Sequence, residues 1–189
     1  IILLIAIPIF SQTNPKEETR VPWGTSQKEY FREWLIIGGF PNQDGKGYDT
    51  DYLQSDGGEN NITPKEGMTH KLPNGMSFEW KNYESPYNYI NFLTSLENVE
   101  YSNKVAYAYK SINRQADGKA ILSFGSNVAN KIWLNGKLVF ERTYGEARTD
   151  DTQIEVDMRK GENSILMKSV HGGWTWGFWM RVIEPESFS

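Results

Sequence analysis

The chain has 189 residues, and 20 Lys and Arg residues against 24 Asp and Glu residues give it a formal net charge of −4. This balance argues against a nucleic-acid-binding module that works by neutralising phosphates. The hydrophobic content of 38% and the aromatic content of 14% are typical of a folded globular domain, and the length fits one core. The absence of cysteine from the sequence excludes disulfides, thiolate nucleophiles and cysteine zinc sites within it.

The first segment of the sequence has the pattern of a secretory signal. Residues 1–10 are wholly apolar and are followed by the small residue Ser11 and a polar stretch. The apolar run is too short to span a bilayer. Because no Met and no basic segment precede it, we interpret residues 1–11 as a signal peptide truncated at its N-terminus. A buried N-terminal strand is the alternative interpretation.

The remaining chain divides into a linker and one domain. Residues 12–27 are polar, contain two prolines and predict a linker, whereas residues 28–185 carry the strand patterns of the domain. The signal predicts a secreted or periplasmic protein with no membrane attachment after cleavage. The segment after residue 183 has no natural stop, so we expect the polypeptide to continue.

The domain reads as β-structure almost throughout. Alternating apolar residues predict strands at residues 34–40, 76–80, 105–109, 120–124, 131–134, 137–140, 154–158, 165–170 and 178–182. Asn135-Gly136 predicts a hairpin, because these residues supply the two positive φ angles of a type I′ turn. We expect a short helical turn within residues 89–96 and a long, glycine-rich loop at residues 41–67. The pattern predicts an all-β fold, an antiparallel β-sandwich or jelly roll.

Three stretches of the sequence resemble a known group of modules. They are WLIIGGFPN at residues 34–42 with the acidic loop after it, GSNVANKIWLNGK at 125–137, and KGEN at 160–163 with the two strands that follow. These stretches resemble the galactose-binding-like jelly-roll modules of bacterial secreted hydrolases, including the sugar-binding domain of family 2 glycoside hydrolases. The resemblance covers residues 34–183 and implies a non-catalytic accessory module, although a fold alone does not establish an activity.

The residues themselves offer no catalytic constellation. The two histidines, His70 and His171, are far apart in sequence and no His-Glu-x-x-His motif holds a zinc ion. The run from His171 to Trp174 is similar to the oxyanion turn of esterases, but the sequence contains no Gly-x-Ser-x-Gly nucleophile turn. Sequence spacing cannot place two carboxylates across a sugar for glycoside hydrolysis. We therefore predict that the module is not an enzyme.

The glycine-rich loop suggests a structural calcium ion. Residues 42–47 imitate a calcium loop, but Phe40 and Asp51 stand at the end positions where an EF-hand needs an Asp and a Glu. A different calcium site, of the kind that pins loops in galactose-binding-like modules, would use Asp49, Asp51 and Glu59 with backbone carbonyls. Alternatively, these acids hydrogen-bond turn amides.

The aromatic residues predict a sugar-binding surface. Trp34, Trp80 and Trp133 lie inside strand patterns and are expected to be core residues. Two other tryptophans flank Thr175 in a glycine-rich loop, where an exposed ring can stack on a pyranose, and the loop before residue 154 offers a second aromatic ring and a charged donor. The predicted carbohydrate-binding residues are Trp174, Trp176, Tyr144 and Arg148.

Two functions follow from these features. The first is a non-catalytic carbohydrate-binding accessory module of a larger secreted bacterial enzyme, with a glycan or polysaccharide as ligand and a C-terminal catalytic domain as partner. The alternative is a structural protein-protein interaction sandwich of a periplasmic or cell-surface protein, whose aromatic end contacts protein.

Overall fold

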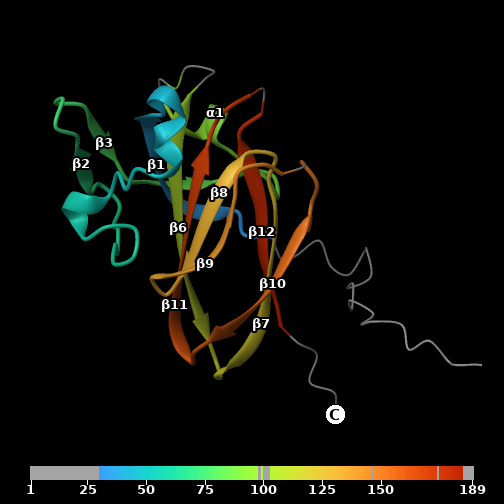
Figure 1. Ribbon diagram of the computed structural model, residues 1–189. Helices are drawn as coiled ribbons and strands as arrows, with labels where there is room; N and C mark the ends of the chain where they lie inside the picture. The colour runs from blue at the N-terminus through green and yellow to red at the C-terminus, as the bar shows by residue number, and fades with distance from the viewer. Residues whose placement is uncertain (1–29, 98, 100–102, 146, 174, 185–189) are drawn as a thin grey trace, which may run out of the picture.

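The computed structural model describes residues 30–97, 99, 103–145, 147–173 and 175–184. The predicted signal peptide and linker lie outside these residues and stay predictions. Two antiparallel sheets face each other across the core (Figure 1). The six-stranded sheet runs in the order β4 (Lys81–Glu84), β1 (Glu33–Pro41), β6 (Lys104–Arg114), β11 (Gly161–Val170), β8 (Ala129–Leu134) and β9 (Lys137–Arg142). The four-stranded sheet runs in the order β10 (Thr152–Met158), β7 (Gly118–Gly125), β12 (Gly177–Ile183) and β5 (Ile90–Asn91).

The remaining elements are short. They are the hairpin of β2 (Thr69–Lys71) and β3 (Ser77–Glu79), the 3-10 helices η1 (Gln43–Tyr48) and η2 (Gln54–Asp56), and the α-helical turn α1 (Phe92–Ser95). The predicted antiparallel β-sandwich and the helical turn are confirmed. Strands β2, β4 and β5 were not expected from the sequence, because each has at most four residues. In addition, the residues of β2 and β4 are mostly polar. Among the described residues, no helix is long and apolar enough to cross a membrane.

The main core lies between the two sheets and follows the strand alternation. On β6, Ala106 and Ala108 face the four-stranded sheet, so the sheets approach closely there. Trp34 and Phe178 meet edge to face across this core, with ring centroids 5.1 Å apart. The predicted assignment of Trp34 to the core is therefore confirmed, and aromatic pairs of this geometry add to the stability gained from apolar burial.

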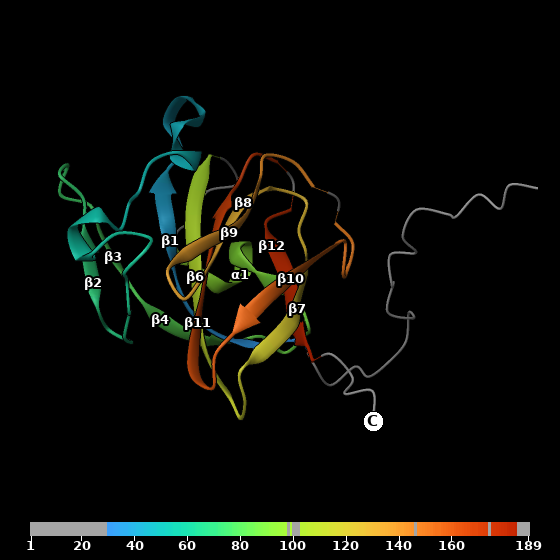
Figure 2. The same ribbon diagram turned by 60° about the horizontal axis from the view of Figure 1, so that its bottom comes forward.

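A second core lies on the other face of the six-stranded sheet. Tyr107 and Trp133 point to this face, where Phe40, Leu53 and Trp80 cover them. Residues 42–80 supply most of the cover, and both views place the β2–β3 hairpin on the side of this sheet opposite β7, β10 and β12 (Figure 1, Figure 2). Because β6 is buried on both faces over residues 105–109, its sequence is an almost continuous apolar run.

The β8–β9 hairpin forms through the predicted turn. Asn135 has φ 51° and Gly136 has φ 78°, the two positive values that a type I′ turn requires. A Cβ atom at Gly136 would lie 2.1 Å from the carbonyl oxygen of Asn60, so the hairpin also packs directly against the covering segment. Glycine is therefore required at this position for conformation and for space.

Replacing Gly136 with alanine tests this contact. We expect the free energy of unfolding to fall by about 2 kcal/mol, because the variant adds a steric clash to backbone strain. Gly161→Ala is the matched control, since Gly161 has φ 86° but no atom within 4 Å of its virtual Cβ. Urea denaturation should show a smaller loss, about 1 kcal/mol, for the control. Equal losses in the two variants would contradict the contact with Asn60.

Candidate functional site

Three loops meet at one end of the sandwich, and we call the surface they form the loop-end surface. Their described residues are 126–128, 143–145, 147–151, 171–173 and 175–176, and the loops join β7 to β8, β9 to β10 and β11 to β12. The Ser126 hydroxyl donates to the Gly177 carbonyl at 2.8 Å, and the Asn127 side-chain amide donates to the Thr175 hydroxyl. A Cβ atom at Gly145 would lie 2.3 Å from the Ser126 carbonyl. The three loops therefore form one continuous surface.

Trp176 does not lie on this surface, and its prediction as a sugar-binding residue is wrong. The side chain is fully buried. Its indole Nε1 donates to the Ser169 hydroxyl at 3.0 Å, and its ring stacks on His171 with centroids 5.1 Å apart. A partner for the indole N–H inside the sandwich lets the ring turn inward, where it packs against Phe92. Trp174, the other tryptophan of the prediction, lies outside the described residues.

Tyr144 and Arg148 do lie at the predicted end. Both are exposed, and the Tyr144 side chain is 77% accessible. The Arg142 guanidinium fixes the first part of their loop: it donates to Asp151, to the Ser126 carbonyl and, at 3.0 Å, to the Thr152 hydroxyl. Arg142 is a positioning residue that the sequence reasoning missed.

Asp150 fixes the last part of the same loop. Its carboxylate accepts from Arg181 Nε at 3.0 Å and Nη2 at 2.6 Å, and from the Ser123 hydroxyl at 2.6 Å. The Tyr30 hydroxyl also donates to it at 2.7 Å. Burial, followed by the hydrogen bond and charge of Asp150, raises the pKa of Tyr30 to about 12. The loop that presents Tyr144 is therefore held by charged groups at both ends, which lowers the entropy it would lose on binding a ligand.

The three predicted calcium ligands point to different partners. Asp49 pairs with Lys131 at 3.3 Å. Asp51 accepts from the backbone amides of Leu53, at 2.9 Å, and Glu59, at 3.1 Å, as an acid in a turn commonly does. Among the described residues, no group of three His, Cys, Asp or Glu side chains is placed to hold a metal ion. The side chains as arranged here do not fit the predicted site.

A lysine ammonium occupies the centre of this loop instead. Lys168 is 1% exposed, and its Nζ donates to the carbonyls of Tyr48 at 2.9 Å and Thr50 at 2.7 Å and to Glu59 Oε1 at 2.9 Å. The Tyr107 hydroxyl donates to the same Glu59 oxygen at 2.7 Å. Carbonyl and carboxylate oxygens are the ligands that calcium prefers. Here they surround a cation that the chain itself supplies.

The calcium binding predicted from the sequence is untested, and chelation tests it. Because Lys168 already satisfies the inward carbonyls, we expect EDTA to change the melting temperature by less than about 1 °C, as no ligand specific to the folded state is removed. Magnesium chloride controls for ionic strength when calcium chloride is added back. A rise of several degrees that only calcium produces would contradict this expectation.

The described histidines do not form a hydrolytic triad. His70 Nδ1 contacts both Asp56 and, at 3.4 Å, the Ser55 hydroxyl. A triad requires the acid and the nucleophile on opposite ring nitrogens, so this arrangement orients the imidazole without activating the serine. His171 is buried against Trp176, and burial lowers its pKa. Neither histidine reaches an exposed nucleophile among the residues that the structure describes.

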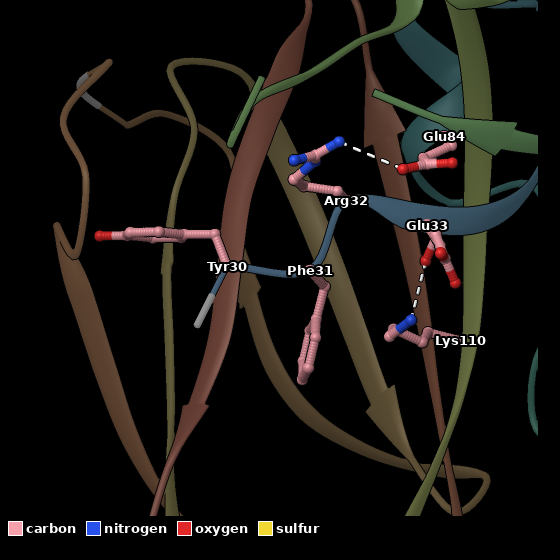
Figure 3. Close-up of a pocket in the computed structure, with 6 residues that line it drawn as sticks. All are labelled: Tyr30, Phe31, Arg32, Glu33, Glu84 and Lys110. Atoms are coloured by element: carbon pink, nitrogen blue, oxygen red, sulfur yellow. Dashed lines mark hydrogen bonds and ion pairs between the residues drawn. The ribbon is translucent and has the colours of Figure 1, made fainter. Parts of the chain in front are cut away.

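A shallow pocket opens where the chain enters the domain (Figure 3). Its volume is about 280 Å³, and Tyr30, Phe31, Arg32, Glu33, Glu84 and Lys110 line it. Its charged groups already have partners, since Arg32 pairs with Glu84 at 3.1 Å and Lys110 Nζ donates to the Glu33 carbonyl at 2.9 Å. The pocket is therefore a weaker candidate for a ligand than the loop-end surface.

No family model and no curated protein matches this sequence. Among solved structures, the chain is similar to a beta-glucosidase from Kluyveromyces marxianus, with 14% identity, TM-score 0.47 and coverage of 79% of this chain and 16% of that one. A glycosyl hydrolase family 2 member from Bacteroides cellulosilyticus has 14% identity, TM-score 0.44 and coverage of 82% and 20%. A family 35 carbohydrate-binding module from Clostridium thermocellum has 17% identity, TM-score 0.35 and coverage of 52% and 90%.

The chain spans less than a quarter of the two hydrolases and nine-tenths of the module. Similarity at this level identifies neither a ligand nor an activity. The chain is an antiparallel β-sandwich.

Proposed function

We propose that this chain is a non-catalytic carbohydrate-binding module of a larger secreted bacterial enzyme that acts on carbohydrate. The observation that carries the proposal is the exposed ring of Tyr144 on a loop fixed at both ends by Arg142 and Asp150. A sugar binds an aromatic side chain through its apolar face, and a ring held in place binds with a smaller loss of conformational entropy than a mobile one. Arg148, on the same loop as Tyr144, supplies a hydrogen-bond donor for the hydroxyl groups of the sugar.

The absence of a catalytic arrangement among the described residues supports a binding role. Two described carboxylates of this region are engaged in ion pairs, Asp150 with Arg181 and Asp151 with Arg142. Glycoside hydrolysis needs two carboxyl groups that flank a bound sugar, one of them free to donate a proton. We therefore propose that the chemistry belongs to another part of the enzyme and that this domain holds the substrate.

Replacing Tyr144 with alanine tests the proposal. We expect the wild-type protein to be retarded in native gels that contain a soluble polysaccharide, and the variant to bind about tenfold more weakly because the stacking ring is lost. Its stability should stay within about 0.5 kcal/mol of the wild type, since an exposed side chain contributes little to folding. Trp176→Ala is unsuitable for this test, because its ring is part of the core.

Leu138 provides the control, since it is exposed on β9 next to the Asn135-Gly136 turn, away from the loop-end surface. Leu138→Ala should bind like the wild type. If no polysaccharide retards the wild-type protein, carbohydrate binding is ruled out and the alternative, a protein-interaction domain, is favoured. Turnover of a glycoside by this chain alone would contradict the non-catalytic assignment.

A further inference from the structure

The outer face of the four-stranded sheet carries aromatic residues that the proposed function does not use. Along β12, Phe178 and Met180 point into the core, so Trp179 and Arg181 point outward. Trp179 is partly exposed, and its ring packs on Tyr89 with centroids 4.3 Å apart.

Two more tyrosines extend this feature. Tyr87, on the turn between β4 and β5, is 74% exposed. Tyr30 lies over Arg181, with 5.1 Å between the guanidinium carbon and the ring centroid, and Figure 3 shows its side chain extending away from Phe31 and Lys110. We call Tyr30, Tyr87, Tyr89 and Trp179 the outer-face strip.

Hydrogen bonds of Ser85 fix the turn that carries Tyr87 and Tyr89. The Ser85 hydroxyl accepts from the Tyr87 amide at 3.2 Å and donates to the Tyr89 carbonyl at 2.7 Å. The Ser85 amide in turn donates to the Arg32 carbonyl at 2.9 Å, which ties the turn to the start of β1. Because Ser85 is itself buried, the turn has a defined conformation and Tyr87 is presented from a rigid base.

The strip is continuous with the loop-end surface. Trp179 pairs with Gly125 across β12 and β7. A Cβ atom at Gly125 would lie 1.7 Å from the Arg148 carbonyl, so the loop of Tyr144 passes directly over Gly125, beside Trp179. A ligand bound at Tyr144 and Arg148 can therefore extend directly onto the outer-face strip at Trp179.

On the opposite outer face, that of the six-stranded sheet, the aromatic side chains of the strands are covered by other segments. Residues 42–80 cover Tyr107, Trp133 and their neighbours on the six-stranded sheet, and the Lys168–Glu59 pair holds that cover down. The two outer faces thus differ, because one buries its aromatic side chains and the other leaves them exposed or partly exposed. An extended ligand has its longest aromatic surface on the four-stranded sheet.

We propose that the outer-face strip binds an extended segment of a neutral polysaccharide whose end lies at Tyr144 and Arg148. This inference rests on the proposed function and names its ligand class. On the same face along β10, Glu155 and Asp157 share one cation, Lys119, at 2.6 and 3.7 Å, and the chain carries a net charge of −4, so an acidic polysaccharide would be repelled. Partly exposed rings beside charged side chains match a ligand with apolar faces and hydroxyl edges.

The test measures the affinity of the chain for barley β-glucan, guar galactomannan and tamarind xyloglucan, with polygalacturonate as the acidic probe, in native gels. We expect at least one neutral polymer to retard the wild type more strongly than polygalacturonate does. Tyr87→Ala should weaken that binding about fivefold and Trp179→Ala about tenfold or more, as hot-spot aromatic residues do. Glu155→Gln, on the same face, should leave binding to the neutral polymer unchanged.

A second measurement covers the case in which Trp179→Ala does not fold. The neutral polymer should change the tryptophan fluorescence of the wild type, and Trp179→Phe, which keeps an aromatic ring in place, should lose most of that change. The inference is overturned if Tyr87→Ala and Trp179→Phe behave as the wild type while Tyr144→Ala loses binding, which leaves the proposed function intact. Preference for polygalacturonate, or a concentration-dependent dimer abolished by Tyr87→Ala, would also overturn it. Failure of every polymer to bind the wild type would overturn both proposals.

Discussion

Replacing Glu59 with glutamine is expected to lower the free energy of unfolding by about 3 kcal/mol at neutral pH, because it leaves a buried ammonium without its counter-charge. Lys168 is 1% exposed, and in this variant its acceptors are neutral: two backbone carbonyls and the amide oxygen of the new glutamine. Urea denaturation measures the loss. Glu141→Gln is the control, since Glu141 pairs with Lys131 at 3.8 Å on the surface and should cost less than about 0.5 kcal/mol.

The difference in the free energy of unfolding between Glu59→Gln and the wild type should become smaller at high pH. Burial lowers the pKa of Lys168 from its usual 10.5, while the nearby Glu59 carboxylate opposes that shift. The glutamine variant loses this opposition, so the pKa of Lys168 falls further. In the folded variant Lys168 then releases its proton at a lower pH than in the folded wild type. Once Lys168 is neutral in both proteins, the loss of the Glu59 carboxylate no longer leaves a buried charge unpaired. The difference in stability should therefore narrow as the pH rises toward 10.5.

Adding Lys168→Met to Glu59→Gln provides a further check. Because methionine removes the buried charge and keeps an unbranched side chain, the double variant should recover part of the stability lost by Glu59→Gln alone. A double variant less stable than the single one by the full cost of Lys168→Met would show that the two residues act independently. That result would contradict the assignment of Lys168 as the cation that holds residues 48–59.

Replacing Asp150 with asparagine is expected to cost about 2 kcal/mol, because Arg181 loses its bidentate ionic partner and Ser123 loses a charged acceptor. The Asp150 side chain is partly accessible, so the cost is smaller than for a fully buried pair. The substitution should also lower the pKa of Tyr30 from about 12 toward 10, since Asp150 contributes to the shift by hydrogen bond and charge. Ultraviolet titration of the phenolate band measures this change against the wild type.

The same variant has a defined pH dependence. In the wild type the raised pKa of Tyr30 keeps the folded phenol neutral above pH 10, where the unfolded chain ionises, so its contribution to stability is lost as the pH rises toward about 12. Asp150→Asn reduces the difference between the folded and unfolded pKa values of Tyr30. The variant should therefore lose less stability than the wild type as the pH rises from 10 to about 12. A Tyr30 pKa that does not move would contradict the contact. Weaker polysaccharide binding by this variant would link the anchor to the presentation of Tyr144.

The two ion pairs explain why the long loops of this sandwich are ordered. Lys168 reaches Glu59 across 109 positions of the sequence, and Arg181 reaches Asp150 across 31. Each pair joins a strand to the loop that lies on its outward face, one on each sheet. Loops of this length have weak local preferences, so a buried contact to a strand decides their position.

The sequence alone was sufficient for the longer strands and for the turn between β8 and β9. Period-two alternation places residues 154–158 and 178–182 on the sandwich, and Asn135-Gly136 defines the hairpin, because these signals depend on backbone geometry between near neighbours. The same rule correctly predicts Trp34, Trp80 and Trp133 as buried. The short polar strand β4 was not predicted, since its residues gain their strand conformation from pairing with β1.

The side-chain destinations in the loops were decided only by the tertiary structure. Nothing in the residues around Trp176 indicates that its indole finds Ser169 inside the core, and nothing around Glu59 indicates that a lysine from β11 lies where a metal ion was expected. The sequence by itself determined the antiparallel sandwich and the end of it that carries Tyr144, because strand patterns repeat over short distances. Which loop residues are buried, paired or exposed depends on contacts between segments far apart in the chain. Local sequence patterns do not indicate these contacts.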